Sequence, residues 1–336
     1  MPNCLCALVL DWNVAVLFGG ALGLLVSVMA MTRLTFADRQ VDPWRRAMGH
    51  WLPVGIVGVV FAAAGRADMG IALAMGTSVA AMSVVTGFLL LAGPMELVHP
   101  RAPRIWSFLV APAALVFIVG MHGQLGWAEA LLLLLEGGLV MGIWKERGQL
   151  EPWDQATQAM PGAHWGSSGF IRPLQIVTTL ALVLLSAWAV LRGAEADSRY
   201  AAGTIAATLL SIAMVMPMIS SGAALAGEGL GWAPLTAQVG LVYLNLCLLV
   251  PAVVLVSQAR QWGGGVLMNV PATRRLVDPV LFPRVSWRLD ALLLLILAVL
   301  LLPVAGGQVK LDRRVGGWLI VGYCVYLLHA LIAGMR

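Results

Sequence analysis

The sequence predicts an all-α, polytopic membrane protein with about ten transmembrane helices in two inverted five-helix repeats. Three observations predict this class. First, 60% of the 336 residues are hydrophobic and only 11% are charged, which leaves too little polar surface for a soluble globule of this size. Second, the apolar residues form runs of about 17 to 25 residues, the length that a helix needs to cross a bilayer. Third, Pro and Gly recur at matching positions in the two halves of the chain.

Ten apolar runs are bounded by charged residues or by clusters of Gly and Pro, which mark the ends of spanning helices. The first run follows no Lys or Arg and so lacks the charged start of a signal peptide, and we expect it to be retained as a helix. The predicted spans are residues 11–31, 48–64, 68–93, 105–121, 127–144, 173–192, 200–226, 233–257, 290–305 and 315–334.

A long polar stretch divides these spans into two groups of five. Residues 145–172 contain several acidic residues and a Gly-Ser-Ser-Gly run, which is typical of a hydrophilic linker. The predicted organisation is a first repeat at residues 1–144, a cytoplasmic linker at 145–172 and a second repeat at 173–336. A second interruption, residues 258–289, is basic and half apolar, and we expect it to lie on the membrane surface.

The distribution of Lys and Arg predicts the orientation in the membrane. The loop after the first span carries Arg33, Arg39, Arg45 and Arg46, whereas no Lys or Arg precedes that span. Because cytoplasmic loops are enriched in these residues, the N-terminus is expected outside, with the protein in a bacterial inner membrane. The basic stretch 258–289 would then face outside, against the same rule.

Several other classes of protein are disfavoured. The basic residues are spread over loops between apolar runs, so we expect a lipid bilayer around the chain and no nucleic-acid partner. No catalytic triad elbow, phosphate-binding glycine loop or HExxH motif occurs at a usable spacing, so we expect neither an enzyme nor a cofactor. Cys4 and Cys6 either carry a lipid or a metal, or belong to an ordinary N-terminus.

The Pro and Gly positions predict an internal repeat with helices broken near its centre, as in inverted-repeat transporters. In each half a Pro is followed by a Gly 12 residues later and by another Gly 11 residues after that, and the two halves are offset by 164 residues. These residues are Pro53, Gly65 and Gly76 in the first half, and Pro217, Gly229 and Gly240 in the second half.

The same segments carry a resemblance to a known family. The first half reads Gly49-His50-Trp51-Leu52-Pro53-Val54 and, after Gly65 and Asp68, Gly76-Thr77-Ser78; the second half reads Met216-Pro217-Met218 and then Gly240-Leu241-Val242-Tyr243-Leu244-Asn245. This pattern resembles the sodium/calcium exchanger family, whose repeats run from a Gly-Thr-Ser-Leu-Pro-Glu motif to a Gly-Ser-Asn-Ile-Phe-Asn motif. The resemblance covers nearly the whole chain and implies a secondary cation antiporter built from two five-helix repeats.

The departures from the family pattern concern the ion site. The family's cation-binding glutamates fall on Val54 and Met218. Calcium takes six to eight oxygen ligands, usually including carboxylates, so the neutral groups that remain cannot bind it tightly. The polar groups that remain are Thr77 and Ser78 with Ser83 and Thr86 in the first half, and Ser220, Ser221 and Asn245 in the second half. Of these, Thr77, Ser78, Ser220, Ser221 and Asn245 are the candidates for an ion pathway.

Two titratable residues are further candidates. Glu136 lies inside the fifth span, where a carboxylate is either a proton-carrying or cation site or a hydrogen-bonded helix contact beside Gly137 and Gly138. His50 stands where the family has a Thr beside the ion, so it either titrates and gates the pathway or caps its helix. The hydroxyls and Asn245 have a structural alternative too, in bonds to the preceding helical turn or to a neighbouring helix.

Two functions follow from these observations. The first is a secondary cation antiporter with sodium, calcium or protons as candidate ions, among which a monovalent cation or protons are favoured over calcium. The second is a structural or assembly subunit of a larger membrane complex that keeps the exchanger scaffold. A polar cavity at mid-membrane containing Glu136 or Asn245 would favour transport. A packed apolar centre between residues 54, 73, 218 and 237 would favour the structural role.

Overall fold

The computed structural model describes residues 12–35, 43–93, 109–146, 171–196, 201–227, 232–267, 278–282, 284–305 and 312–335. These residues form ten continuous helical segments, which confirms the predicted all-α polytopic fold. Within this described part, seven segments are long and apolar enough to cross a membrane. Cys4, Cys6 and Gly229 lie outside the described residues, as does most of the predicted linker.

The helices follow the order of the predicted spans. The first half contains α1 (Trp12–Thr35), α2 (Pro43–Ala63), a long segment of α3 (Ala67–Ala80), η2 (Ala81–Val85) and α4 (Thr86–Ala92), then α6 (Val110–Val119) with η3 (Gly120–His122), and α7 (Trp127–Glu146). The second half contains α8 (Ile171–Ala196), a segment of α9 (Ala202–Ile205), η4 (Ala206–Leu210) and α10 (Ser211–Gly227), a segment of α11 (Trp232–Leu244), η5 (Asn245–Leu249) and α12 (Val250–Leu267), then α13 (Arg284–Ala305) and α14 (Arg313–Gly334).

The stretch expected on the membrane surface, residues 258–289, is helical at both of its described ends. Helix α12 continues to Leu267 and α13 already begins at Arg284, several residues before the predicted start. Between them, β2 (Val280–Leu281) pairs antiparallel with β1 (Gln124–Leu125), a short contact that the sequence did not predict. The earlier start of α13 places Asp290 two turns inside a helix rather than at its end.

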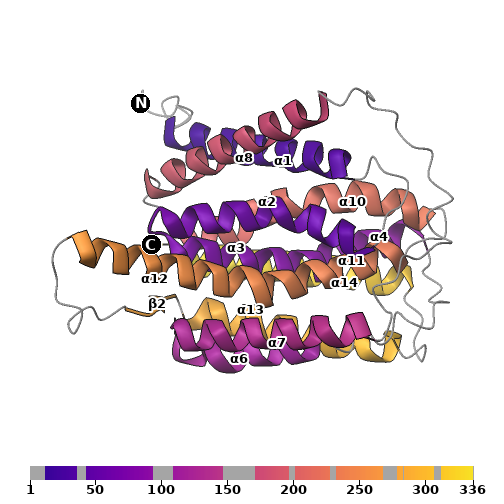
Figure 1. Cartoon of the computed structure of the whole chain (residues 1–336). Helices are drawn as coiled ribbons and strands as arrows, with labels where there is room; N and C mark the ends of the chain where they lie inside the picture. Colours follow the sequence, from indigo (N-terminus) through magenta and orange to yellow (C-terminus); the bar gives the residue numbers. More distant parts are fainter. Residues whose placement is uncertain are drawn as a thin grey trace, which may run out of the picture.

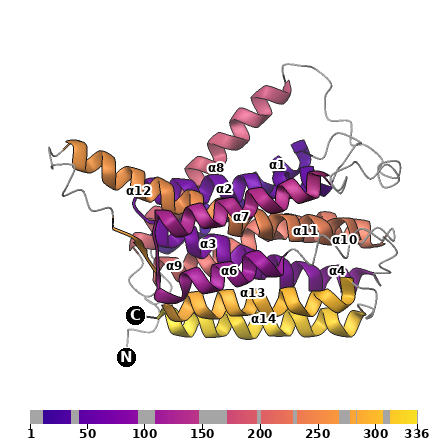
Figure 2. The same cartoon turned by 60° about the horizontal axis from the view of Figure 1, so that its bottom comes forward.

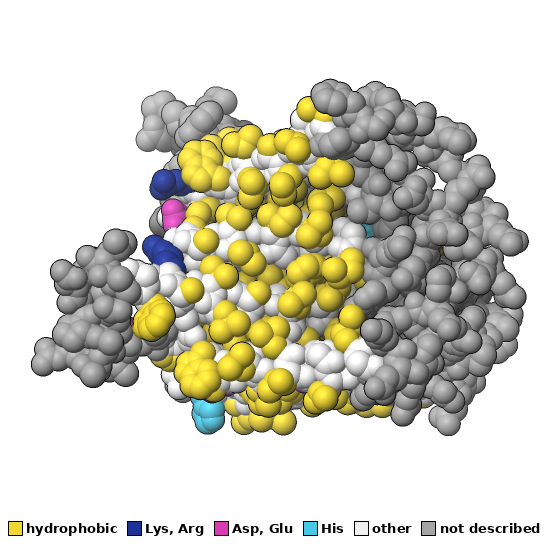
Figure 3. All heavy atoms as spheres, viewed as in Figure 1, with side chains coloured by type: hydrophobic (Ala, Val, Ile, Leu, Met, Phe, Trp, Pro, Cys, Tyr) yellow, Lys and Arg dark blue, Asp and Glu magenta, His cyan; other side chains and the backbone are white. Residues whose placement is uncertain are grey.

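The helices form a bundle with α3 at its centre (Figure 1). The segment from α3 to α4 is almost entirely buried by other helices, whereas α14 is mostly exposed. Helix α1 packs along α8 at one side of the bundle, and α13 packs against α6 at the other (Figures 1 and 2). Figure 3 shows apolar side chains across the middle of one face, with the charged side chains drawn there at its left end. This distribution suits a lipid-facing belt.

The predicted helix breaks take a different form in the structure. Helix α2 runs through Pro53 and α10 runs through Pro217 without interruption. A Pro lacks the N–H that would bond the carbonyl four residues earlier, which in α2 is the carbonyl of Gly49. Gly65 does end a helix, since it closes the turn between α2 and α3 with a φ of 91°.

The irregular backbone lies instead in π-helical turns inside the long segments. Two of these, η2 and η5, begin at Ala81 and Asn245, and 245 minus 81 equals 164, the offset between the two halves. A π-helical turn inserts an extra residue into a helix and often occurs at functional sites. The equal offset supports the predicted repeat, whose division at residues 1–144 and 173–336 stays a prediction.

Candidate functional site

A polar cluster joins the two halves where α3 meets η5. Asn245, the first residue of η5, is wholly buried. Its Nδ2 donates to Oγ1 of Thr77 at 2.9 Å and to Oγ of Ser78 at 3.1 Å, and lies 3.4 Å from the carbonyl oxygen of Ala74. Three of the candidate residues therefore meet at one point.

The direction of each hydrogen bond in this cluster is determined by the helix backbone. Thr77 donates its hydroxyl proton to the carbonyl of Leu73 at 2.7 Å, and Ser78 donates to the carbonyl of Ala74 at 2.7 Å. A hydroxyl has one proton, so both oxygens accept from Asn245. Within the described residues, Oδ1 of Asn245 has no hydrogen-bond partner. The cluster thus offers one buried, neutral oxygen atom that is still free to accept.

A second bond between the halves lies about two helical turns further along the same helical segments. Thr86 donates from Oγ1 to Oε1 of Gln238 at 2.8 Å, and both residues are wholly buried. The sequence analysis missed Gln238, although an amide in the apolar run from Leu235 to Val239 is a signal, because a buried amide requires a partner. The two bonds run between antiparallel helices, since Asn245 follows Gln238 whereas Thr77 precedes Thr86.

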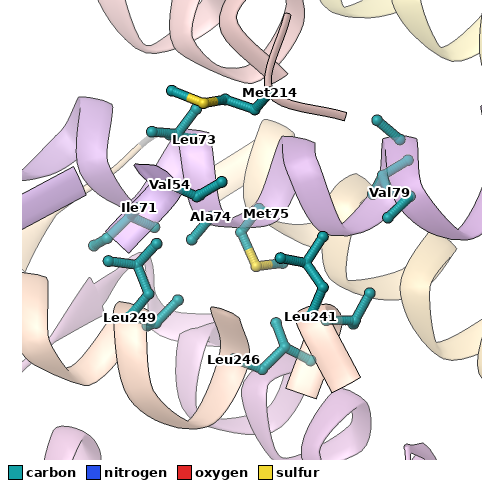
Figure 4. Close-up of a cluster of buried hydrophobic side chains, with 14 of the residues drawn as sticks. Val54, Ile71, Leu73, Ala74, Met75, Val79, Met214, Leu241, Leu246 and Leu249 are labelled. Atoms are coloured by element: carbon teal, nitrogen blue, oxygen red, sulfur yellow. The ribbon is translucent and has the colours of Figure 1, made fainter. Parts of the chain in front are cut away.

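Apolar side chains surround this polar cluster. Val54 and Met218, at the positions of the family glutamates, are 1% and 3% exposed, and Leu73 and Ala237 are equally buried. Figure 4 shows side chains of Val54, Leu73, Leu241 and Leu246 in the packed cluster around α3. The centre between residues 54, 73, 218 and 237 is therefore apolar. Among the described residues, no three His, Cys, Asp or Glu side chains gather as a metal site would require.

The remaining hydroxyl candidates bond within their own helix. Ser220 and Ser221 in α10 each donate to the carbonyl of Pro217 at 3.0 Å. His50 is buried in α2, one turn after Arg46, which is also buried. None of these three residues has a hydrogen bond to Asn245 in the described part of the chain.

Glu136 lies on the other side of η5, in the middle of α7. Its side chain is half-buried, and Oε2 has no partner among the described residues. Close packing holds this region together, because Tyr243 donates to the carbonyl of Gly137 at 2.6 Å and a Cβ at Gly137 would lie 2.9 Å from Cβ of Cys247. Glu136 thus adjoins η5, but on the face away from α3.

The structure also contains a pocket that the sequence analysis did not identify. It has a volume of about 240 Å³ and lies between α3, α9, α13 and α14. Its lining includes two carboxylates, Asp68 and Asp290, and Asp290 is only 6% exposed.

An ion pair lies at the rim of this pocket. Arg66 bonds Asp68 through Nε at 3.1 Å and Nη2 at 3.0 Å, and its Nη1 lies 3.9 Å from Glu195. The hydrogen bond to Asp68 raises the pKa of the Arg66 guanidinium, so Arg66 stays positively charged.

Comparison with known proteins identifies the fold. No family model matches the chain, and no protein with a curated description matches it. Among solved structures, the chain is similar to the H+/Ca2+ exchanger CAX, with 12% identity, a TM-score of 0.69, and coverage of 96% of this chain and 84% of that chain. It is similar to native YfkE, with 14% identity, a TM-score of 0.68, and coverage of 95% and 92%. It is similar to the sodium-calcium exchanger NCX_Mj, with 15% identity, a TM-score of 0.57, and coverage of 97% and 99%.

These likenesses confirm the resemblance at the level of the fold. The chain has the fold of the cation/calcium exchangers, with ten helical segments in the expected order. The solved structures named as exchangers are transporters rather than enzymes.

Proposed function

We propose that this protein is a secondary cation antiporter that carries a monovalent cation or protons rather than calcium. The observation that carries this proposal is the neutral polar cluster at the centre of an exchanger fold. Asn245, Thr77 and Ser78 join the two halves, and the positions of the family glutamates are the buried side chains Val54 and Met218.

The charge of the cluster favours a singly charged cargo. A calcium ion takes six to eight oxygen ligands and needs negative charge to compensate it in the membrane. Among the side-chain oxygens of the cluster, Oδ1 of Asn245 has no partner in the described part of the chain, whereas the oxygens of Thr77 and Ser78 already accept from Nδ2 of Asn245. A neutral amide oxygen suits a water molecule or a monovalent ion far better than a divalent one.

Glu136 is the proposed proton carrier. A carboxylate in the middle of a spanning helix is costly to keep ionised, so such residues commonly belong to ion or proton pathways. Glu136 is half-buried, has a free Oε2, and adjoins η5, the element that carries Asn245. In alternating access, the packed pair α1 and α8 would move over the central helices. The protein would lie in a bacterial inner membrane with its N-terminus outside.

A second function is favoured by a specific observation as well. The positions 54, 73, 218 and 237 carry buried apolar side chains, and the hydroxyls of Thr77 and Ser78 already have partners. These features suit a structural or assembly subunit of a larger membrane complex that has lost its ion site. The two proposals differ in one measurable property, the movement of ions.

Flux in proteoliposomes tests the proposal. Purified protein would be reconstituted, and sodium, calcium and proton fluxes followed under gradients imposed in both directions. We expect sodium or proton flux that reverses with the gradient, no calcium flux, and loss of flux in Glu136→Gln. The matched control is Glu129→Gln, at the first turn of the same helix, where Oε2 accepts from the N–H of Gly126 at 2.9 Å.

Each other result contradicts part of the proposal. Calcium flux equal to the sodium or proton flux would refute the monovalent specificity. Flux retained in Glu136→Gln would remove Glu136 from the pathway. No flux of any of the three ions, in protein shown to be folded by size-exclusion chromatography, would leave the structural subunit as the better function.

A further inference from the structure

The pocket between α3, α9, α13 and α14 shares no lining residue with Asn245, Thr77 or Ser78, and it extends to the end of the bundle where α3 begins. A backbone hydrogen bond of 3.0 Å from the N–H of Ala201 to the carbonyl of Gly334 joins the start of α9 to the end of α14. Figure 2 shows α3 and α9 together with the C-terminus at the left of the bundle. The pocket's lining includes Ala201 and Ala330, so it lies near this end.

The ion pairs of the described residues leave one buried carboxyl of the pocket, Asp290, without a charged partner. Asp68 is balanced by Arg66 at 3.0 Å. Asp290 forms no ion pair with any Lys or Arg in the described part of the chain, although it is 94% buried. Tyr323 and Tyr326 of α14 lie close to Asp290, and Tyr326 also lines the pocket. A carboxylate buried without a counter-charge is unfavourable and takes up a proton, so a single positive charge in the pocket would allow Asp290 to remain ionised.

Aromatic and small apolar side chains form much of the remaining wall. Phe282, Trp287 and Tyr326 all line the pocket, and the ring centroids of Phe282 and Trp287 are 4.5 Å apart. Aromatic faces attract cations, and cages of such rings are used to recognise ammonium groups that carry alkyl substituents. Ile71 and Met75 add apolar surface that a hydrated metal ion would not use.

The size of the pocket also favours an organic ligand. Its volume of about 240 Å³ far exceeds that of one inorganic ion. A single water needs only roughly 10–15 Å³ of such space. A bare metal ion would leave most of this space to water, against a largely apolar wall.

We infer that this pocket binds a small organic ammonium ion, with Asp290 as its counter-charge and Phe282, Trp287 and Tyr326 around its alkyl groups. The inference goes beyond the proposed function, because it does not depend on what the Asn245 cluster carries. The ammonium group belongs either to a free amine or to the headgroup of a lipid such as phosphatidylethanolamine.

Binding of tetramethylammonium to the full-length protein tests the inference. Isothermal titration calorimetry in detergent is expected to show saturable binding to one site. Asp290→Asn keeps the size of the side chain but removes its charge, and should weaken binding at least about tenfold. The matched control is Asp278→Asn, an exposed carboxylate next to β2 that does not line the pocket, which should bind as the unchanged protein does.

A pair of ligands makes the test independent of any variant. Choline and its neutral carbon analogue 3,3-dimethyl-1-butanol have the same shape, so only choline should displace tetramethylammonium. Sodium at equal concentration should not displace it. No saturable binding, equal displacement by the neutral analogue or by sodium, or unchanged affinity in Asp290→Asn would each overturn the inference.

The affinity for tetramethylammonium in nanodiscs of two lipid compositions distinguishes a lipid headgroup from a free amine as the natural ligand. If the site holds a lipid headgroup, phosphatidylethanolamine in the nanodisc should weaken tetramethylammonium binding compared with phosphatidylglycerol alone. If the site holds a free amine, the affinities in the two nanodiscs should agree. Both results support an ammonium site, whereas loss of binding in both nanodiscs as well as in detergent would refute it.

Discussion

The side-chain amide of Asn245 donates to Oγ1 of Thr77 at 2.9 Å and so joins two residues that are 168 positions apart in the chain. The bond crosses between the halves of the bundle at the point where η5 begins. A buried amide in a membrane core requires a partner, so this bond and the neighbouring one to Ser78 connect α3 with η5.

The first prediction concerns this connection. Asn245→Ala and Thr77→Val should each lower the free energy of unfolding, and a double-mutant cycle should give a coupling of about 0.6 to 1.7 kcal/mol. Unfolding in mixed detergent micelles would measure it. Thr178→Val is the control, because Thr178 bonds only within α8, at 2.9 Å from the carbonyl of Leu174. The effects of Thr178→Val and Asn245→Ala on the free energy of unfolding should add without coupling. Additive effects of Thr77→Val and Asn245→Ala would contradict the prediction.

The second prediction concerns the close approach of α3 to η4. A Cβ at Gly76 would overlap the carbonyl oxygen of Ala207 and Oγ of Ser211. Because a backbone carbonyl cannot move aside, Gly76→Ala should destabilise the protein by about 1–3 kcal/mol. Gly138→Ala in α7 is the matched control, since no atom lies within 4 Å of a Cβ there. Thermal unfolding measures the stability of both variants. Equal melting temperatures would show that the close contact between α3 and η4 tolerates a side chain at position 76.

The third prediction concerns the turn between α2 and α3. Gly65 has a φ of 91°, and a Cβ there would overlap Nη1 of Arg260. Gly65→Ala should cost about 1–2 kcal/mol from the backbone alone. The double variant Gly65→Ala with Arg260→Ala separates the two causes in thermal unfolding. If Arg260→Ala restores full stability, the side-chain overlap rather than the backbone conformation is responsible.

The fourth prediction concerns the apolar centre. Val54 is 1% exposed, so Val54→Glu should lower stability by about 2.5–3.5 kcal/mol, the cost of a charge at the centre of a spanning helix. Val54→Gln, which has the same size without the charge, should cost less. The melting temperature of Val54→Glu would then be measured with and without calcium. Stabilisation by calcium would show that the centre still holds the geometry of a divalent site.

Much of the fold could be predicted because it depends on local properties of the chain. Long apolar runs must form helices in lipid, and so the ten segments and their order follow from the sequence. A hydrogen bond from Asn245 to a neighbouring helix could be predicted for a similar reason, since an isolated amide in an apolar run requires a partner. The exchanger resemblance identified Val54 and Met218 as the positions where the acidic ligands are missing.

The details of the helix interiors were harder to predict. Pro53 and Pro217 suggested breaks, yet both helices continue through these residues because packed neighbours support the backbone there. The π-helical turns η2 and η5 carry no Pro or Gly, and so no local residue type indicates them. Their position depends on how the long helices pack against each other.

The sequence by itself determined the membrane class, the helices and the neutral character of the centre, because these follow from residue type and spacing along the chain. Only the tertiary structure decided which polar groups meet. The pocket joins Asp68, Thr204, Asp290 and Tyr326, which come from four distant segments. Asp290 stands at the predicted start of a span, where a carboxylate is usually solvated. In the folded chain α13 packs against α3, and Asp290 is buried.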